Sequence, residues 1–404
     1  MTITPEFIAR IPKTDLHVHL DGSLRLQTLI ELAAEQQVTL PAPDVAGLRE
    51  KVFKEKYGSL TEYLQGFGLT CAVMQTESAL ERVAYELAVD NQQEGVRYIE
   101  VRFAPQLHQH QHLNCIAVLR AVSRGLERAK EEFNSREEVQ TKQEPPFEFG
   151  IIACAMRMFG RGSSEYFDTL LDVHAHSERK WIFSLASQEL VRAAVEARDR
   201  FGVPVVGFDL AGAEAGYPAE DHKAAYDLAH KSFLKKTVHA GEAFGPESIF
   251  QAITDLHADR IGHGYYLFDP EKIKDPGIKD RERYVKELVE FIADRRITIE
   301  VCLTSNLQTN PELRDIKKHS FAKMRQAKLS ATFCTDNRTV SSTTVSHEIT
   351  KAVTAFDITP HELKNFVIYG FKRSFFPETY SRKRAYVHQI IDYYEKVEKE
   401  FGLR

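Results

Sequence analysis

Two histidines separated by one residue, His17 and His19, end a short apolar run near the start of the chain. In a β-strand, side chains at positions i and i+2 point to the same side, so these imidazoles can converge on one metal ion. The spacing alone is not specific, because H-x-H also occurs at 108/110, 110/112 and 174/176. The place of the 17/19 pair at the end of a predicted strand makes it the candidate ligand pair, since barrel enzymes draw catalytic groups from such ends.

Three more polar residues end later apolar runs in the same way, namely His239, His263 and Asp336. A buried imidazole or carboxylate is costly unless it is paired or bound to a metal. Together with His17 and His19, His239 and Asp336 make a plausible zinc set with a further position for water. The alternative for His263 is a core histidine whose hydrogen bonds are satisfied within the fold.

Glu242 lies three residues after His239, in the segment His-Ala-Gly-Glu. This spacing places its carboxyl group beside the ligands without making it a ligand, which is the usual place of a proton carrier. His263, between two glycines, can share the proton transfer or hold a water. Ser305 and Asn306, at the end of the seventh apolar run, are expected to support the residues that contact the metal or the substrate, without touching either themselves. The alternative is that Glu242 is an ordinary loop residue at a helix start.

Eight short apolar runs alternate with longer amphipathic stretches, and several runs are almost continuous in Val, Ile, Phe and Cys. This pattern is typical of parallel strands that are buried on both faces. Strands alternating with helices in this way predict one α/β domain, a (β/α)8 barrel. The runs are 13–19, 98–104, 149–156, 203–211, 235–241, 259–264, 297–303 and 329–336.

Two connections are longer than one barrel helix requires. Residues 20–97 separate the first two strands, and we expect them to form a helical subdomain over one end of the barrel. Residues 265–295 are highly charged and contain two Asp-Pro pairs, which predicts a surface insertion followed by a helix.

Composition excludes several classes of protein. The 404 residues carry a net charge of −5, so no basic excess supports a nucleic-acid partner. No apolar run approaches the roughly 20 residues of a membrane span, and no signal peptide is visible. The five cysteines are an odd number without CxxC spacing, which predicts reduced core residues in a cytoplasmic protein. The sequence leaves the oligomeric state open.

The motifs of the chain, taken in order, resemble the adenosine deaminase family of the amidohydrolase superfamily. The resemblance covers nearly the whole chain, and HAGE, GHG and CxTSN are highly specific in combination. The matching segments are TDLHVHLDGSL (14–24), EYLQGF (62–67), YIEVRFAP (98–105), GFDLAGAE (207–214), TVHAGEAFGPESI (237–249), RIGHG (260–264), EVCLTSNLQT (300–309) and CTDN (334–337).

This resemblance implies one zinc ion per chain and a role for each matching residue. Glu242 is similar to the acid that protonates purine N1, and His263 to the residue that orients the zinc-bound hydroxide. Hydroxide would then attack C6, and ammonia would leave. The residues that resemble the zinc ligands are His17, His19, His239 and Asp336.

On the substrate side, Gly212 resembles the backbone donor to purine N3, and Asp21 the contact to the ribose 5′-hydroxyl. One motif departs from the family, whose usual Thr-Asp-Asp-Pro is Thr-Asp-Asn-Arg at 335–338. The second acid normally contacts N7, which is an acceptor, and the amide of Asn337 can donate to it at any pH. Purine binding is therefore compatible with the change, although the exact substrate stays open. The alternative is a turn asparagine without a ligand contact.

Leu60, Tyr63, Leu64 and Phe67 repeat at helical spacing, which predicts the buried stripe of a helix. The resemblance adds that this helix lies over the pocket. Leu60, Tyr63 and Phe67 would then form an apolar cover over a bound nucleoside, and one helix face can serve both purposes.

Arg102 and Arg157 lie within or directly after apolar runs. Since a buried arginine needs partners, we expect structural ion pairs, with Glu100 or Asp209 as candidates. The histidines at 108, 110 and 112 are interpreted as a solvated loop after the second strand.

The leading hypothesis is zinc-dependent deamination of adenosine or 2′-deoxyadenosine to inosine or 2′-deoxyinosine and ammonia. Alternatives within the class are adenine, an adenosine nucleotide or aminodeoxyfutalosine, and the Asp21 carboxylate argues against a phosphate at the 5′ end. Two other classes are a PHP-type metal-dependent phosphoesterase, which shares the opening D-L-H-x-H, and a catalytically silent barrel. Metal content separates them, because a phosphoesterase of this type needs two or three ions.

Overall fold

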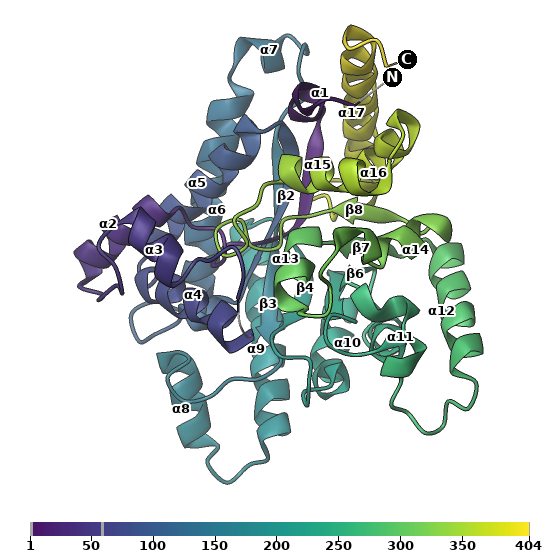
Figure 1. Ribbon diagram of the computed structural model, residues 1–404. Helices are drawn as coiled ribbons and strands as arrows, with labels where there is room; N and C mark the ends of the chain where they lie inside the picture. The colour runs from purple at the N-terminus through teal and green to yellow at the C-terminus, as the bar shows by residue number, and fades with distance from the viewer. Residues whose placement is uncertain (1–2, 58–59, 404) are drawn as a thin grey trace.

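The computed structural model describes residues 3–57 and 60–403. Eight parallel strands pair in sequence order around a barrel, which confirms the predicted (β/α)8 architecture, and Figure 1 shows them surrounded by helices. The last turn of the barrel returns to β1, because the Asp336 amide donates to the His17 carbonyl at 2.7 Å. The strands are β1 (Lys13–His19), β2 (Val96–Phe103), β3 (Glu148–Met156), β4 (Val205–Ala211), β5 (Lys235–Ala240), β6 (Arg260–His263), β7 (Thr298–Val301) and β8 (Ala331–Phe333).

The helices start and stop at residues whose chemistry suits a helix end. Pro246 occupies the first turn of α11, and Gly202 ends α9 in the left-handed region at φ 66°. The α-helices are α1 (Pro5–Arg10), α2 (Leu26–Gln36), α3 (Val45–Lys51), α4 (Leu60–Val73), α5 (Glu77–Gln93), α6 (Cys115–Asn134), α7 (Glu137–Gln140), α8 (Glu165–Val173), α9 (Arg179–Phe201), α10 (Lys223–Lys231), α11 (Pro246–Thr254), α12 (Arg281–Arg295), α13 (Leu303–Thr309), α14 (Phe321–Gln326), α15 (Val345–Phe356), α16 (Pro360–Arg373) and α17 (Tyr380–Glu400). Short 3₁₀ helices are η1 (Pro105–Leu107), η2 (Ala219–His222), η3 (Tyr265–Phe268), η4 (Pro270–Lys272) and η5 (Ile316–Lys318).

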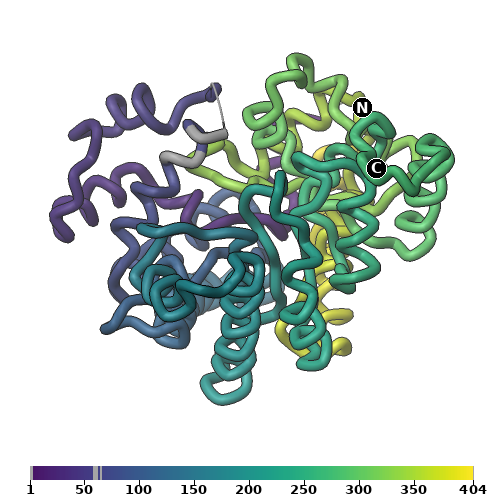
Figure 2. The backbone as a smooth tube through the Cα atoms, turned by 90° about the horizontal axis from the view of Figure 1, so that it is seen from below, coloured from purple at the N-terminus to yellow at the C-terminus, as the bar shows by residue number. Residues whose placement is uncertain are grey.

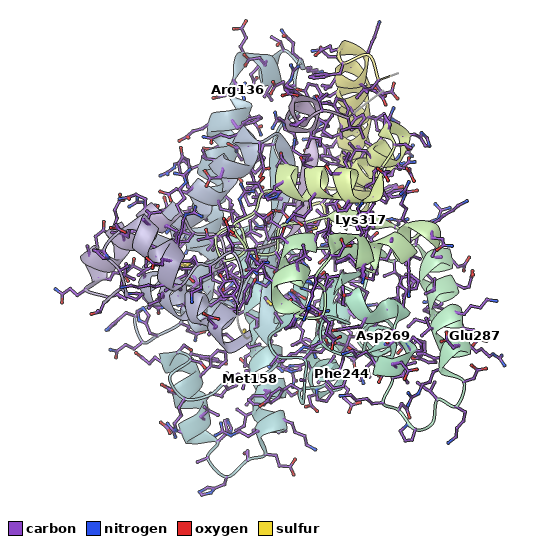
Figure 3. The ribbon with its side chains drawn as sticks, in the orientation of Figure 1. Arg136, Met158, Phe244, Asp269, Glu287 and Lys317 are labelled. Atoms are coloured by element: carbon purple, nitrogen blue, oxygen red, sulfur yellow. The ribbon has the colours of Figure 1, made fainter. Side chains whose placement is uncertain are left out.

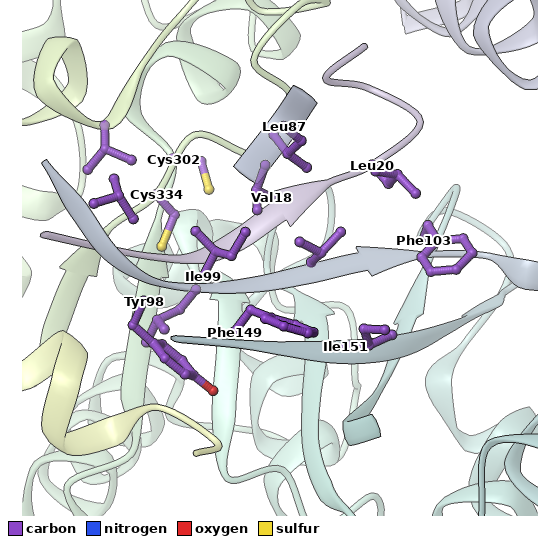
Figure 4. Packing of buried hydrophobic residues seen from close by; sticks show 14 of the residues in the cluster. Val18, Leu20, Leu87, Tyr98, Ile99, Phe103, Phe149, Ile151, Cys302 and Cys334 are labelled. Atoms are coloured by element: carbon purple, nitrogen blue, oxygen red, sulfur yellow. The ribbon is translucent and has the colours of Figure 1, made fainter. Parts of the chain in front are cut away.

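Apolar side chains of the strands pack beneath the helices. Every residue of β2 is buried, and Ile99 and Phe103 belong to one continuous core together with Leu87 of α5. Figure 4 shows this packing, with Cys302 and Cys334 among the apolar side chains. All five cysteines are free thiols, and all except Cys71 are buried.

The axis of the barrel is filled by charged side chains instead. Arg102 donates to Asp209 and to Glu300, each at 2.9 Å, and none of the three is exposed to solvent. Arg260 donates to the other oxygen of Glu300 at 2.6 Å and also pairs with Glu100. The prediction that Arg102 pairs with Asp209 is confirmed, and Glu300 is a partner that the sequence did not reveal.

The long connection between β1 and β2 contains four helices, α2 to α5. Of these, α5 packs along α6 and against β2, so it belongs to the ring of helices around the barrel. The additional part is formed by α2, α3 and α4, which stand out to one side in Figures 1 and 2. The segment 265–295 holds η3, η4 and then α12. No helix in the described part of the chain has the length and hydropathy needed to cross a membrane.

Candidate metal centre and active site

Four side chains at the C-terminal ends of three strands converge on one point. His17 and His19 come from β1, His239 from β5, and Asp336 from the segment after β8; their ligand atoms all lie within 4.8 Å of one another. The Nε2 atoms of His19 and His239 are 3.2 Å apart, and Asp336 Oδ1 is 3.5 Å from His17 Nε2. The buried His17 Nε2 forms no hydrogen bond with a described residue. Facing imidazole nitrogens beside a carboxylate are the donor set of a divalent metal ion.

Two buried carboxylates orient the ligand imidazoles. His17 Nδ1 donates to Glu300 at 2.8 Å, and His239 Nδ1 donates to Asp209 at 3.1 Å. With the proton on Nδ1, each ring turns the lone pair of Nε2 toward the cluster. Burial raises the pKa of Asp209, but the electrostatic interactions with His239 and Arg102 outweigh it and hold this pKa well below its usual value.

A second group that shares Asp336 contains His263 and Cys302. Burial raises the pKa of the Cys302 thiol well above its ordinary value. The first group offers four ligand residues and this second group three, so the three-histidine set is the more complete metal site.

Local backbone conformation helps to aim two of these groups. Asp336 has φ 60° and His263 has φ 65°, both in the left-handed region that costs a residue with a side chain about 1–3 kcal/mol. The Asp336 carbonyl accepts from the His19 amide at 2.7 Å, which fixes the turn after β8 against the end of β1. Strain at these two strand ends marks the same edge of the barrel as the metal ligands.

His263 is held by a directed series of hydrogen bonds. The Phe321 amide donates to His319 Nδ1 at 3.0 Å, so His319 Nε2 carries the proton and donates to Asn306 Oδ1 at 3.1 Å. The amide nitrogen of Asn306 then donates to His263 Nδ1 at 3.2 Å. This order assigns the His263 proton to Nε2, which lies 3.8 Å from Glu242 Oε2. Burial lowers the pKa of His319 to about 3, so His319 is neutral in this series.

Glu214 holds the loop that carries Glu242. Its carboxylate accepts the amides of Gly241 (3.0 Å), Ala243 (2.8 Å) and Phe244 (2.9 Å), and also pairs with a serine hydroxyl. Three amides around Glu242 thus bind one buried carboxylate. Phe244 is labelled in Figure 3, on the loop between β5 and α11. Glu214 ends the motif GFDLAGAE, but its role could not be predicted from the sequence, because its partners lie on the loop after another strand.

The residues predicted on the substrate side lie around this centre. Asp21 is buried with Oδ1 3.9 Å from His19 Nδ1, and burial raises its pKa to about 7. Gly212 follows β4 with φ 104°, a conformation that favours glycine. Asn337 is buried beside Asp336, and its amide donates to the Tyr63 hydroxyl at 2.8 Å.

Tyr63 and Phe67 come from α4. Tyr63 is buried, its ring centroid is 5.9 Å from that of Phe67, and its hydroxyl is 3.2 Å from Ser341 Oγ. Phe67 is half-buried. The side chain of Leu60 lies outside the described residues.

Two predictions about polar residues are wrong. Arg157 forms no ion pair with a described carboxylate; it donates to the carbonyls of Tyr217 (2.9 Å) and His239 (2.5 Å). His108 is buried, whereas we expected it to be solvated with His110 and His112. Burial lowers the pKa of His108 to about 4. In both cases the burial depends on segments that are distant in sequence, which local patterns do not locate.

A parallel (β/α)8 barrel with a three-histidine, one-aspartate cluster at its strand ends defines a metal-dependent hydrolase of the amidohydrolase type. The adenosine deaminase family model matches residues 12–179 and 177–393. The chain belongs to the adenosine deaminase family, and as a member it is a hydrolase.

Known relatives cover almost the whole chain. Adenosine deaminase from Mycobacterium leprae is 36% identical over 389 residues, 96% of each chain. The crystal structure of Arabidopsis ADAL complexed with IMP is 25% identical, covers 97% of this chain and 99% of its own, and has a TM-score of 0.73. An amidohydrolase from Burkholderia ambifaria with bound Zn shares the fold at 20% identity and a TM-score of 0.76, covering 100% of this chain and 97% of its own.

Proposed function

We propose that this protein deaminates adenosine and 2′-deoxyadenosine hydrolytically, giving inosine or 2′-deoxyinosine and ammonia. The observation that carries the proposal is the position of Glu242, 3.8 Å from His263 and beside the convergent ligand set, in a chain of this family. Its side chain is 29% exposed, so a ring bound at this edge of the barrel can reach it.

We assign the metal to one zinc ion held by His17, His19, His239 and Asp336. The partnerless Nε2 of His17 and the close approach of the His19 and His239 nitrogens support this fit. When bound, zinc lowers the pKa of water toward 7 and so makes hydroxide available at neutral pH.

Glu242 in its protonated form donates a proton to purine N1, which makes C6 open to attack by water. His263 keeps its Nε2 proton facing the Glu242 carboxyl group and holds the attacking oxygen in place. One proton of the attacking water restores Glu242 and the other goes to the former amino group, which leaves as ammonia, while the oxygen stays on C6. One water is consumed for each ammonia released, so the reaction balances.

Three further residues bind the substrate in this proposal. The Gly212 amide donates to N3, and Asp21 contacts the 5′-hydroxyl. One proton of the Asn337 amide is directed to Tyr63, and the second is left for purine N7, which accepts it at any pH. Tyr63 and Phe67 cover the nucleoside from α4.

The test is the ultraviolet absorbance of adenosine incubated with zinc-loaded protein. We expect conversion to inosine, with kcat reduced about a hundred- to ten-thousandfold in Glu242→Gln, because the amide cannot deliver the proton. The matched control is Glu220→Gln, which changes a carboxyl group bonded to Gln251 outside the centre.

Absence of conversion by protein that holds one zinc per chain would contradict adenosine as substrate. Adenine, AMP and aminodeoxyfutalosine would then be compared under the same conditions. A content of two or three ions would contradict the deaminase assignment and favour a phosphoesterase.

A further inference from the structure

A cavity of about 570 Å³ lies among the segments that lead into β5, β6 and β7, at the end of the barrel opposite the metal ligands. The connection between α16 and α17 closes its remaining side. Its volume is within the range of small-molecule pockets, roughly 300–1,000 Å³. The cations that line it are Lys235, Arg295, Arg296, Lys372, Arg373 and Lys383.

The cavity has almost no negative charge to balance these cations. Asp259 is the only carboxylate among the described residues that line it. This carboxylate is shared, because its Oδ2 atom accepts the amide of Lys236 at 2.9 Å and lies 3.2 Å from Lys236 Nζ, and its Oδ1 atom lies 3.9 Å from Lys235 Nζ. It therefore balances at most one of the six cations. The whole chain has a net charge of −5, so this concentration of positive charge runs against its composition.

Two of the cations show that the cavity lacks a counter-charge. Arg373 Nε is buried and forms no hydrogen bond with a described residue. Burial lowers the pKa of Lys383 to about 8, and repulsion from Arg260, Lys235 and Arg373 adds to it, although Glu100 opposes the shift. An anion in the cavity would give Arg373 Nε a hydrogen-bond acceptor and would reduce the repulsion between Lys383 and its neighbouring cations.

Cations at helix C-termini are common because they interact favourably with the helix dipole. α12 ends at Arg295 and α16 ends at Arg373, so this explanation accounts for part of the cluster. It does not account for Lys235 or Lys383, which lie on other elements. Closer to the start of α12, by contrast, Arg283 pairs with Glu287, which is labelled in Figure 3.

We propose that this cavity binds a small, multiply charged phosphate compound of the triphosphate class. Arginine and lysine side chains hold phosphate oxygens through charge-assisted hydrogen bonds, and several cations converging from separate segments suit a chain of phosphates. Ile253, Ala258 and Ile297 form an apolar part of the wall beside the cations, and the buried Phe375, stacked on Arg260 at 3.5 Å, lies behind it. The proposal is independent of the deaminase function.

Isothermal titration of the metal-loaded protein at physiological ionic strength tests the proposal, with inorganic triphosphate and ATP as separate probes. We expect saturable binding of one molecule per chain. The double variant Arg295→Gln/Lys372→Gln should weaken it at least about tenfold, because it removes two charged contacts. Arg281→Gln/Lys286→Gln is the matched control, since it removes the same charge from the first half of α12, and it should leave the affinity unchanged.

Both probes also chelate metals, so the titration is repeated with His19→Ala, which lacks a proposed zinc ligand. Unchanged affinity in that variant places the probe at the basic cavity. Equal affinity for both probes assigns recognition to the phosphate chain, and tighter binding of ATP adds a contact between its base and the apolar wall; either result supports the proposal. Absence of binding, or equal losses of affinity in the two double variants, would overturn the proposal.

Discussion

Glu214 illustrates how one side chain can fix a loop that belongs to another strand. It follows β4, whereas the three amides that it accepts belong to the loop after β5. These amides come directly before and after Glu242, so the carboxylate defines where the proposed proton carrier can lie.

We therefore expect Glu214→Gln to lower kcat about ten- to hundredfold, in the range seen when outer partners of a site are removed. The Glu214 carboxylate only accepts hydrogen bonds, and the loop amides only donate them. In glutamine an NH2 group replaces one of the two carboxylate oxygens and faces the loop N–H groups, so the loop must shift. KM should change less than kcat, and the zinc content should stay the same. Steady-state kinetics across pH together with metal analysis checks this, with Glu220→Gln as control; an equal rise in KM would indicate a general loss of the pocket.

Gly22 is the second informative single residue. A Cβ added there would lie 1.8 Å from Asn337 Oδ1, so Gly22→Ala must displace the Asn337 side chain. If Asn337 donates to N7, KM for adenosine should rise about tenfold while zinc stays bound. Gly68→Ala is the control, because nothing lies within 4 Å of a Cβ at that position. Unchanged KM in Gly22→Ala would argue against the N7 contact.

At the scale of elements, the strands were predictable because buried parallel strands are nearly continuous in apolar residues, as in Val96–Phe103. The ligand residues were predictable because each ends such a run. Contacts between distant segments were not. His319, on the segment before α14, reaches His263 only through Asn306, and nothing in the local sequence indicates that link. For the same reason the pattern of 20–97 predicted helices but not that α5 joins the outer ring.

Helix α16 offers a stability test away from the site. Thr359 and Glu362 form a reciprocal capping box at its start. Thr359→Ala should lower the free energy of unfolding by about 1 kcal/mol, because the Glu362 amide loses its acceptor. Denaturant unfolding measures this. Thr350→Ala, within α15, is the control and should change stability by less than about 0.5 kcal/mol.

At the scale of the molecule, the free energy of unfolding should decrease in acid, because histidines that are buried in the neutral form bind protons only after the chain unfolds. The pKa of His108 is about 4 in the folded chain because of burial, against 6.5 when unfolded. Between these values the unfolded state binds a proton that the native state does not, so stability decreases as pH falls from 6.5 toward 4. The full contribution of His108 is about 3 kcal/mol.

His108→Leu removes this titration, so its unfolding free energy should depend less steeply on pH between 6.5 and 4 than that of the native chain. The exposed His112, replaced by Gln, serves as control and should retain the native slope. Equal slopes in all three proteins would show that His108 is not buried neutral.

The charged axis of the barrel has a consequence for how this sequence can change over generations. The single carboxylate of Glu300 binds His17, Arg102 and Arg260 at once, and none of these groups has access to water that could replace a lost partner. A surface ion pair can be exchanged one residue at a time, because each intermediate is tolerated. Here the first substitution of any one of these residues leaves buried charges without partners and destabilises the fold. The set therefore cannot change through a series of neutral single substitutions. Homologous chains should therefore keep or replace these residues as a set, while the helices around them diverge freely.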